Sequence, residues 1–103
     1  MIIFVDIDDT ICRTPNWEEN KLDYNSAEPI VERIEEINNL YNEGHKIHYW
    51  TARGSKTGMD WWQVTYQQLK DWGCKYHGLH TGKPAYDLFI CDKAVNSDDY
   101  FNK

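Results

Sequence analysis

Residues 2–10 read IIFVDIDDT, and this stretch decides the fold. Four apolar residues, Ile2 to Val5, run directly into the carboxylates of Asp6, Asp8 and Asp9. A continuous run of β-branched and aromatic residues is typical of a strand buried in a parallel sheet. Ligands bind at the carboxyl ends of strands in open α/β sheets, so we expect this strand to deliver its acids to a functional site. Such a cluster of acids repels itself unless a cation or a substrate balances it.

Length and composition indicate one small globular domain. The chain has 103 residues, of which 41% are hydrophobic and 15% aromatic, and these values suit a folded protein with one modest core. No apolar stretch approaches membrane-spanning length, so we expect no membrane partner. The N-terminal apolar run is too short for a signal peptide and has no basic residues before it. We therefore expect a cytoplasmic protein.

The net charge limits the possible binding partners, and the cysteines indicate the redox compartment. The 11 basic and 17 acidic residues give a net charge of −6, which argues against extended nucleic-acid binding. This balance still allows a small phosphorylated substrate. The three cysteines, Cys12, Cys74 and Cys91, form no CxxC pair, and free thiols in a reducing compartment are the simpler interpretation.

The rest of the chain alternates predicted strands and helices. Residues 11–25 are predicted to form a loop or short hairpin near the acidic turn, either a solvated connection or a flap that closes over substrate. Asn25 or Ser26 can cap a helix that ends near Gly44. The remaining predicted elements are strands over 45–50, 76–80 and 88–91 and helices over 58–72 and 97–101. This order predicts an α/β fold, with a mostly parallel sheet covered by helices on both faces.

Polar residues follow the predicted strands. Asp6 and Asp8 follow the first strand, Thr51 follows the second, and Asp92 follows the fourth. Lys83 lies in the loop before the fourth strand. The carboxyl ends of parallel strands share one edge of the sheet, so we expect these side chains to surround one pocket.

The connection between the third and fourth predicted strands is unusually short. Only residues 81–87 join them, whereas a parallel crossover needs a dozen residues or more. Either the third strand is marginal, or the crossover is an extended segment, or this strand is antiparallel.

Four short motifs give the chain a resemblance to the haloacid dehalogenase (HAD) superfamily of phosphotransferases. Their residues are Asp6, Asp8 and Thr10 in the first motif, Thr51 in the second, Lys83 in the third and Asp92 in the fourth. The match covers almost the entire chain. It implies a single Rossmann-like (HAD) domain over residues 1–103 with no large cap domain. The implied activity is that of a Mg²⁺-dependent phosphomonoesterase that acts through an aspartyl-phosphate intermediate.

The resemblance implies a separate role for each catalytic residue. Asp6 would attack phosphorus and form the aspartyl phosphate. Asp8 would protonate the leaving oxygen and later take a proton from water. Thr51 would donate its hydroxyl to a phosphate oxygen, and Lys83 would neutralise the nucleophile and the transferring phosphoryl group.

The resemblance also implies a metal site and further phosphate contacts. Mg²⁺ prefers a few carboxylates together with waters and phosphate oxygens. Its ligands would be the side chain of Asp6, the backbone carbonyl of Asp8, and Asp92. Further phosphate-binding groups would come from Thr10, Ala52 and Arg53, the last two through their backbone N–H groups.

The sequence departs from the usual superfamily pattern at two places. Asp9 stands where Gly is common, and it adds a charge to which we assign no role. The fourth motif often has two acids, but here Asp92 stands alone and Asp87 lies before the predicted strand. An extended strand of four residues spans roughly 13 Å, so these two acids would not both reach one metal ion.

Residues 82–87, GKPAYD, and 91–96, CDKAVN, look like a narrower group. They are similar to small HAD phosphatases found with capsular polysaccharide biosynthesis, and this resemblance suggests a sugar phosphate or other small phosphorylated metabolite. A site without a cap usually admits a large substrate, or a neighbouring subunit covers it. A homo-oligomer is therefore a further expectation.

Three other functions are weighed against this hypothesis. A nucleic-acid end (3′-phosphate) phosphatase or nucleotidase of the same superfamily needs few basic contacts, although the acidic balance counts against it. A phosphoreceiver domain needs its phosphorylated Asp after a mid-chain strand, where this chain has Thr51. A non-catalytic phosphate-binding protein would not need the complete set of acids, Thr and Lys.

Overall fold

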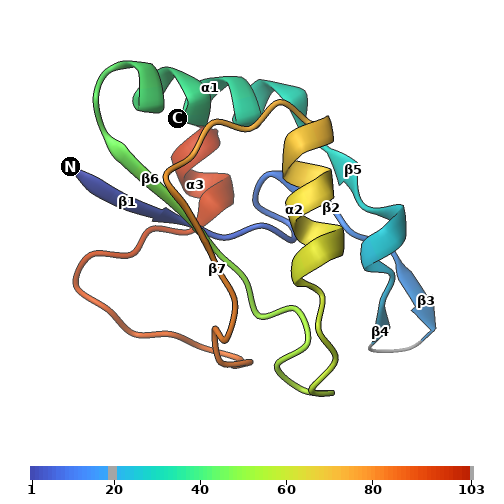
Figure 1. The fold of residues 1–103 in the computed structure, drawn as a ribbon. Helices are drawn as coiled ribbons and strands as arrows, with labels where there is room; N and C mark the ends of the chain where they lie inside the picture. The colour runs from blue at the N-terminus through green and yellow to red at the C-terminus, as the bar shows by residue number, and fades with distance from the viewer. Residues whose placement is uncertain (19–20, 103) are drawn as a thin grey trace.

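A three-stranded parallel sheet forms the centre of the computed structural model, which describes residues 1–18 and 21–102. The first strand, β1 (Ile2–Val5), pairs with β6 (Lys46–Trp50), and β6 pairs with β7 (Gly78–His80). All three were expected as strands, and their parallel pairing is confirmed (Figure 1). Among the described helices, none is long and apolar enough to span a membrane.

Two helices cover one face of this sheet. α1 (Val31–Asn42) connects β1 to β6, and α2 (Trp62–Asp71) connects β6 to β7. The strand order β1-β6-β7 proceeds in one direction. Crossovers between parallel strands are right-handed, so two crossovers in the same direction place both helices on the same face. The prediction of helices on both faces is therefore wrong for the described residues, because the strand order does not reverse.

The core lies between the sheet and these two helices. Strand β6 alternates, with Ile47 and Tyr49 fully buried and the residues between them directed the other way. Ile34 and Ile37 of α1 and Leu69 of α2 pack against this strand face. The expected helical stripe of apolar residues is therefore what attaches α1 to the sheet.

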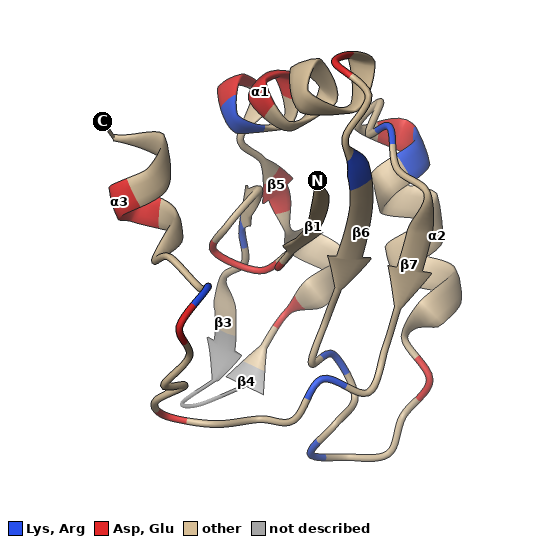
Figure 2. Ribbon diagram, turned by 90° about the vertical axis from the view of Figure 1, so that its left-hand side faces the viewer, with Lys and Arg blue, Asp and Glu red and all other residues tan. Residues whose placement is uncertain are grey.

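Among the described residues, no helix covers the opposite face of the sheet, as Figure 2 shows from that side. Phe4 is 56% exposed there, and its ring stacks on His48 and His80 at centroid distances of 5.2 and 5.8 Å. The two imidazoles are joined by a 3.0 Å hydrogen bond between His48 Nδ1 and His80 Nε2. Gly78 makes room for them, because a Cβ there would stand 2.7 Å from His48 Nδ1.

The segment predicted as a loop, hairpin or flap contains short antiparallel ribbons. β2 (Cys12–Arg13) pairs with β5 (Glu28–Pro29), and β3 (Asn16–Glu18) pairs with β4 (Lys21–Leu22). Residues 19–20 of the predicted flap lie outside the described residues. A 3₁₀ turn over Tyr24–Ser26 and β5 occupy the place where the helix was expected to begin. Caps at Asn25 or Ser26 are thus a wrong prediction, because α1 begins at Val31 after Ile30.

The segment 81–96 contains no described helix or strand before α3 (Ser97–Phe101). The predicted strand over 88–91 is not formed, and Leu88 and Ile90 are 76% and 87% exposed. A short apolar run forms a strand only where another strand offers it a ladder, and this run has no such partner here. The short connection that seemed too brief for a parallel crossover therefore does not lead to a fourth strand of the sheet.

Candidate functional site

Asp6 and Lys83 meet at the carboxyl end of the parallel sheet. Asp6 directly follows β1, and Lys83 lies in the irregular segment after β7. Lys83 Nζ lies 3.6 Å from Asp6 Oδ1, and the side chains are 15% and 40% exposed, respectively. Burial raises the pKa of Asp6, and the Lys83 cation opposes that shift. The pair therefore offers an accessible carboxylate with a cation beside it.

Lys83 is held in this position through its backbone and its side chain. Its N–H donates to the backbone carbonyl of Thr51 (3.2 Å), and its own carbonyl accepts from Ser55 Oγ (2.6 Å). Its ammonium lies 5.7 Å from the ring centroid of Trp50 and 5.5 Å from that of Tyr86. Cation–π contacts at this distance favour the charged amine over the rings. These contacts connect the end of β6 to the segment after β7.

Asp8 occupies a different environment from Asp6. Its carboxylate accepts hydrogen bonds from Arg53 at two positions, Nη2 to Oδ1 (2.8 Å) and Nε to Oδ2 (3.0 Å). Thr14 Oγ1 also donates to Asp8 Oδ1 at 2.5 Å. This fork is the bidentate geometry in which guanidinium and carboxylate bind most strongly. Asp8 was expected to keep its carboxyl free for proton transfer, but the structure places it in an ion pair.

Arg53 is buried inside the domain rather than exposed at its surface. Its side chain is 0% exposed, and it also donates to Thr65 Oγ1 (3.1 Å) and Gln68 Oε1 (2.6 Å) of α2. The guanidinium carbon lies 4.8 Å from the ring centroid of Tyr24. The Arg53–Asp8 pair therefore ties the acidic turn to α2.

Some of the groups that were expected to donate hydrogen bonds to a phosphate form hydrogen bonds within the protein instead. Thr51 is 1% exposed, and its hydroxyl oxygen accepts a 3.1 Å bond from Arg53 N–H, one of the two predicted backbone donors. Ala52 and Thr10 are both half-buried. The backbone N–H of Thr10 donates to Ile7 and its carbonyl accepts from Arg33 (3.1 Å), so neither is directed to a ligand.

Asp9 lies at the tip of the acidic turn in the left-handed backbone region, with φ of 59°. Its carbonyl accepts from Arg13 Nη1 (3.4 Å) and Ser97 Oγ (3.3 Å). Arg33 extends this connection with a 2.8 Å bond to Asp98, and it lowers the pKa of that carboxyl. The backbone of Asp9 therefore attaches α3 to the turn, while its own side chain is exposed.

Asp92 lies in the irregular segment and is exposed. Its Oδ1 accepts from the neighbouring Cys91 Sγ at 3.7 Å. Within residues 1–18 and 21–102, no three His, Cys, Asp or Glu side chains gather closely enough to hold a metal ion. The ligand set of Asp6, Asp8 and Asp92 stays a prediction.

Two side chains of the site were given no role in the sequence analysis. Arg53 was expected to contribute only its backbone N–H group, and Thr14 was not considered. A charged residue after a strand is expected to be exposed. The feature of the sequence that could have predicted this ion pair is the cluster of Asp6, Asp8 and Asp9, because three neighbouring carboxylates repel one another unless a cation pairs with at least one of them.

Comparison with known proteins supports the fold. No family model matches the sequence, and no curated protein matches it. The structure is similar to the crystal structure of an MCSG target from Vibrio cholerae, with a TM-score of 0.77 and 23% identity. The alignment covers 97% of this chain and 87% of that one. This likeness supports a small α/β domain built on a parallel sheet.

Proposed function

We propose that this chain is a HAD-type phosphomonoesterase that transfers the phosphoryl group of a small metabolite to Asp6. The observation that carries the proposal is the 3.6 Å pair of Asp6 and Lys83 at the carboxyl end of the parallel sheet. The order of the four motifs supports it. Phosphoryl transfer needs little from the protein beyond positioning and charge stabilisation, and an accessible carboxylate beside a fixed ammonium supplies both.

In the first step, Asp6 forms a bond to phosphorus and the bond to the leaving oxygen breaks. A carboxylate and a phosphate repel each other, and the Lys83 ammonium reduces that repulsion as charge shifts onto the phosphoryl oxygens. The leaving oxygen takes a proton from Asp8, so this step requires a protonated Asp8 carboxyl in place of the ion pair with Arg53. The products of this step are the free alcohol and an acyl phosphate on Asp6.

In the second step, water attacks the phosphorus of the acyl phosphate and restores the Asp6 carboxylate. Asp8 takes the proton from that water and inorganic phosphate leaves. Among the described contacts, Asp8 Oδ2 accepts one bond, from Arg53 Nε, and a carboxylate oxygen retains a further acceptor position for this proton.

That the phosphatase activity requires Mg²⁺ is a separate prediction. The described side chains do not by themselves fit the ion, because no three His, Cys, Asp or Glu side chains among them gather closely enough to hold one, and the expected ligand Asp92 is exposed in the segment after β7. We therefore derive no step through the metal. Titration of activity with Mg²⁺ after treatment with a chelator tests this prediction directly.

The proposed function is tested with a panel of sugar, nucleotide and polynucleotide phosphates, with phosphate release as the measurement. The parent should act on small monoesters, and Asp6→Asn should abolish release because it removes the nucleophile while keeping its shape. The matched control is Asp9→Asn, which removes a carboxylate from the same turn and suits its positive φ, since Asn tolerates that region. Equal activity of Asp6→Asn and Asp9→Asn would refute the proposal.

A further inference from the structure

Two histidines meet on the open face of the sheet, away from the residues proposed to react with phosphate. His48 of β6 is opposite Gly78 in the parallel register, and His80 follows Gly78 by two residues in β7. Side chains two residues apart on a strand project from the same face, so the two imidazoles are diagonal neighbours across the strand pair. Neither histidine has a role in the proposed phosphoryl transfer.

The facing ring nitrogens are spaced almost as one metal ion would hold them. His48 Nδ1 lies 3.0 Å from His80 Nε2. A tetrahedral zinc ion binds imidazole nitrogen at about 2.0–2.1 Å, so two such ligands on one ion are about 3.3–3.4 Å apart. A small rotation of each ring accounts for the difference.

The hydrogen bond between the rings does not prevent both from becoming ligands. A neutral imidazole carries one proton, which either of its nitrogens can hold, and a metal ion binds the nitrogen without it. In the hydrogen-bonded pair, one of the two facing nitrogens carries the proton. When solvent moves that proton to the far nitrogen of the same ring, both facing nitrogens present lone pairs and the number of bound protons is unchanged.

Gly78 provides the space for an ion at this point. A Cβ there would stand 2.7 Å from His48 Nδ1 and 2.8 Å from His80 Nε2, the two atoms that face each other. Gly78 is not among the glycines with positive φ, so the backbone conformation does not require glycine here. What this glycine supplies is therefore room between the two nitrogens.

Phe4 of β1 orders the two imidazoles by stacking against them. Its ring lies 5.2 Å from that of His48 with an interplanar angle of 15°, and 5.8 Å from that of His80 with an angle of 25°. Trp50 in turn packs edge-on against Phe4 at 6.0 Å. Ligands that packing already orients lose less conformational entropy when an ion binds.

The other two histidines of the chain have different partners. His77 Nδ1 accepts a 3.1 Å bond from the backbone N–H of Ile47, and its ring stacks on Tyr41 at 4.7 Å. His45 Nδ1 lies 2.9 Å from the N-terminal nitrogen of Met1. These two histidines therefore serve as controls for the pair on the open face.

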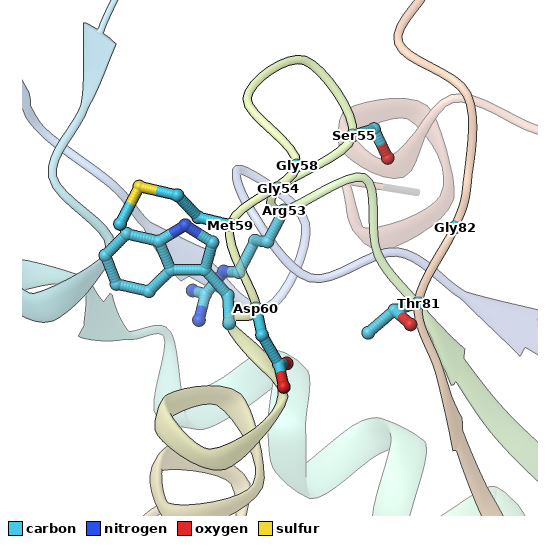
Figure 3. A pocket seen from close by; sticks show the side chains of 9 residues that line it. Arg53, Gly54, Ser55, Gly58, Met59, Asp60, Thr81 and Gly82 are labelled. Carbon is cyan, nitrogen blue, oxygen red and sulfur yellow. The ribbon is translucent and has the colours of Figure 1, made fainter.

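The histidine pair is joined through the backbone to the candidate site. The carbonyl of His80 accepts a 2.9 Å bond from Thr51 N–H, and the carbonyl of Thr51 accepts from Lys83 N–H. Figure 3 shows the chain continuing from β7 through Thr81 and Gly82, opposite the loop that follows β6. An ion that joins β6 to β7 at the histidines therefore fixes the strand ends from which Thr51 and Lys83 follow.

We propose that His48 and His80 together bind one transition-metal ion, with Zn²⁺ as the type case and water in the remaining coordination positions. Within residues 1–18 and 21–102, no group of three His, Cys, Asp or Glu side chains gathers around an ion, so the protein supplies two ligands. Imidazole suits zinc, nickel and copper, whereas Mg²⁺ prefers oxygen ligands. The site is thus separate from any Mg²⁺ used in phosphoryl transfer, and the inference does not rest on the proposed function.

Isothermal titration calorimetry with Zn²⁺ at pH 7.5, in a buffer that does not bind the ion, tests this site. His48→Gln and His80→Gln should each lower the zinc affinity by at least about 10- to 100-fold, the loss that a missing outer-shell partner already causes. The matched controls, His77→Gln and His45→Gln, also remove one imidazole each and should leave this affinity unchanged. A parent that binds no Zn²⁺, or an equal loss in all four variants, would overturn the inference.

Gly78→Ala tests the same site with both imidazoles retained. The added methyl group occupies the space between the facing nitrogens, so zinc affinity should fall as far as in the single histidine variants. Circular dichroism checks that this variant is folded. Zinc binding as tight as in the parent would show that the ion does not lie over Gly78.

Nuclear magnetic resonance locates the bound ion without relying on affinity. The imidazole resonances of His48 and His80, assigned by their loss in the two Gln variants, should shift together on addition of Zn²⁺. Addition of Mg²⁺ should not shift them. A response to Zn²⁺ confined to His45 or His77, or the same response to both ions, would refute the assignment.

Discussion

Removal of the Arg53 guanidinium tests the most unexpected contact of the site. We consider Arg53→Met, which keeps an unbranched side chain of similar length in the same space. The parent side chain is 0% exposed and makes its closest bond to Asp8 at 2.8 Å, while the Asp8 side chain retains 16% exposure. The substitution therefore leaves a nearly buried carboxylate without its cation.

The magnitude follows from that unpaired charge. Breaking a buried pair by removing one partner costs about 3–5 kcal/mol. The remaining exposure of Asp8 lets solvent screen part of its charge, so we expect about 3 kcal/mol, near the low end of this range. A domain of this size is typically stable by about 5–15 kcal/mol, so the loss is a large fraction of the total.

The assay is urea unfolding at pH 7, followed by circular dichroism. The matched control is Arg13→Met, because Arg13 is 56% exposed and its 3.6 Å pair is with Asp98, which is 58% exposed. Exposed pairs contribute about 0–1 kcal/mol, so this control should change the free energy of unfolding little.

A double-mutant cycle with Asp8→Asn isolates the pair. Asp8→Asn removes the charge that Arg53→Met leaves unpaired, so the double variant should be more stable than the sum of the single losses implies. We expect a coupling of about 1–3 kcal/mol, within the range measured for residues in contact. If the two losses add within about 0.5 kcal/mol, or if Arg53→Met is as stable as Arg13→Met, the described ion pair does not hold the acidic turn.

Two further predictions concern thiols and pH. Cys91 is exposed, whereas burial raises the pKa of the Cys12 and Cys74 thiols to about 11. Cys91 should therefore react rapidly with a thiol reagent at pH 8, and the other two cysteines should react only after unfolding. Titration of the thiols in the absence and in the presence of denaturant measures this difference. Since Arg33 lowers the pKa of Asp98 below its unfolded value of about 3.9, the pair stabilises the fold above that pH and loses its contribution as the pH falls through the folded pKa. The difference in free energy of unfolding between the parent and Asp98→Asn should therefore be largest near neutral pH and shrink below about pH 4; a difference that does not change with pH would contradict this pairing.

The sequence predicted the parallel sheet because its strands are locally distinct. β1 is a continuous apolar run, and the buried Ile47 and Tyr49 of β6 alternate with more polar neighbours. The strand predicted over residues 88–91 was wrong because the prediction used local sequence alone. An apolar run of four residues carries no information about whether a neighbouring strand will pair with it. The ribbons over residues 12–29 are only two or three residues per strand, too short to give a period.

The sequence predicted the site residues whose positions follow from strand ends. It did not predict the contacts that depend on which side chains pair with each other. Asp6 and Lys83 are brought together because both follow strands of one parallel sheet. The fork between Asp8 and Arg53 joins residues 45 positions apart, and no local pattern selects one cation among several for that acid. The exposed position of Asp92 follows from the strand that is not formed before it.

The central claim is that Asp6 accepts the phosphoryl group, and the most direct measurement is to trap that intermediate. The protein is mixed with p-nitrophenyl phosphate and Mg²⁺, quenched in acid within the first turnover, digested and examined by mass spectrometry. The account predicts one phosphoryl group on the peptide that contains Asp6, absent from Asp6→Asn and retained in Asp9→Asn. Hydrolysis of the substrate with no phosphoryl group on Asp6 at any quench time would contradict it.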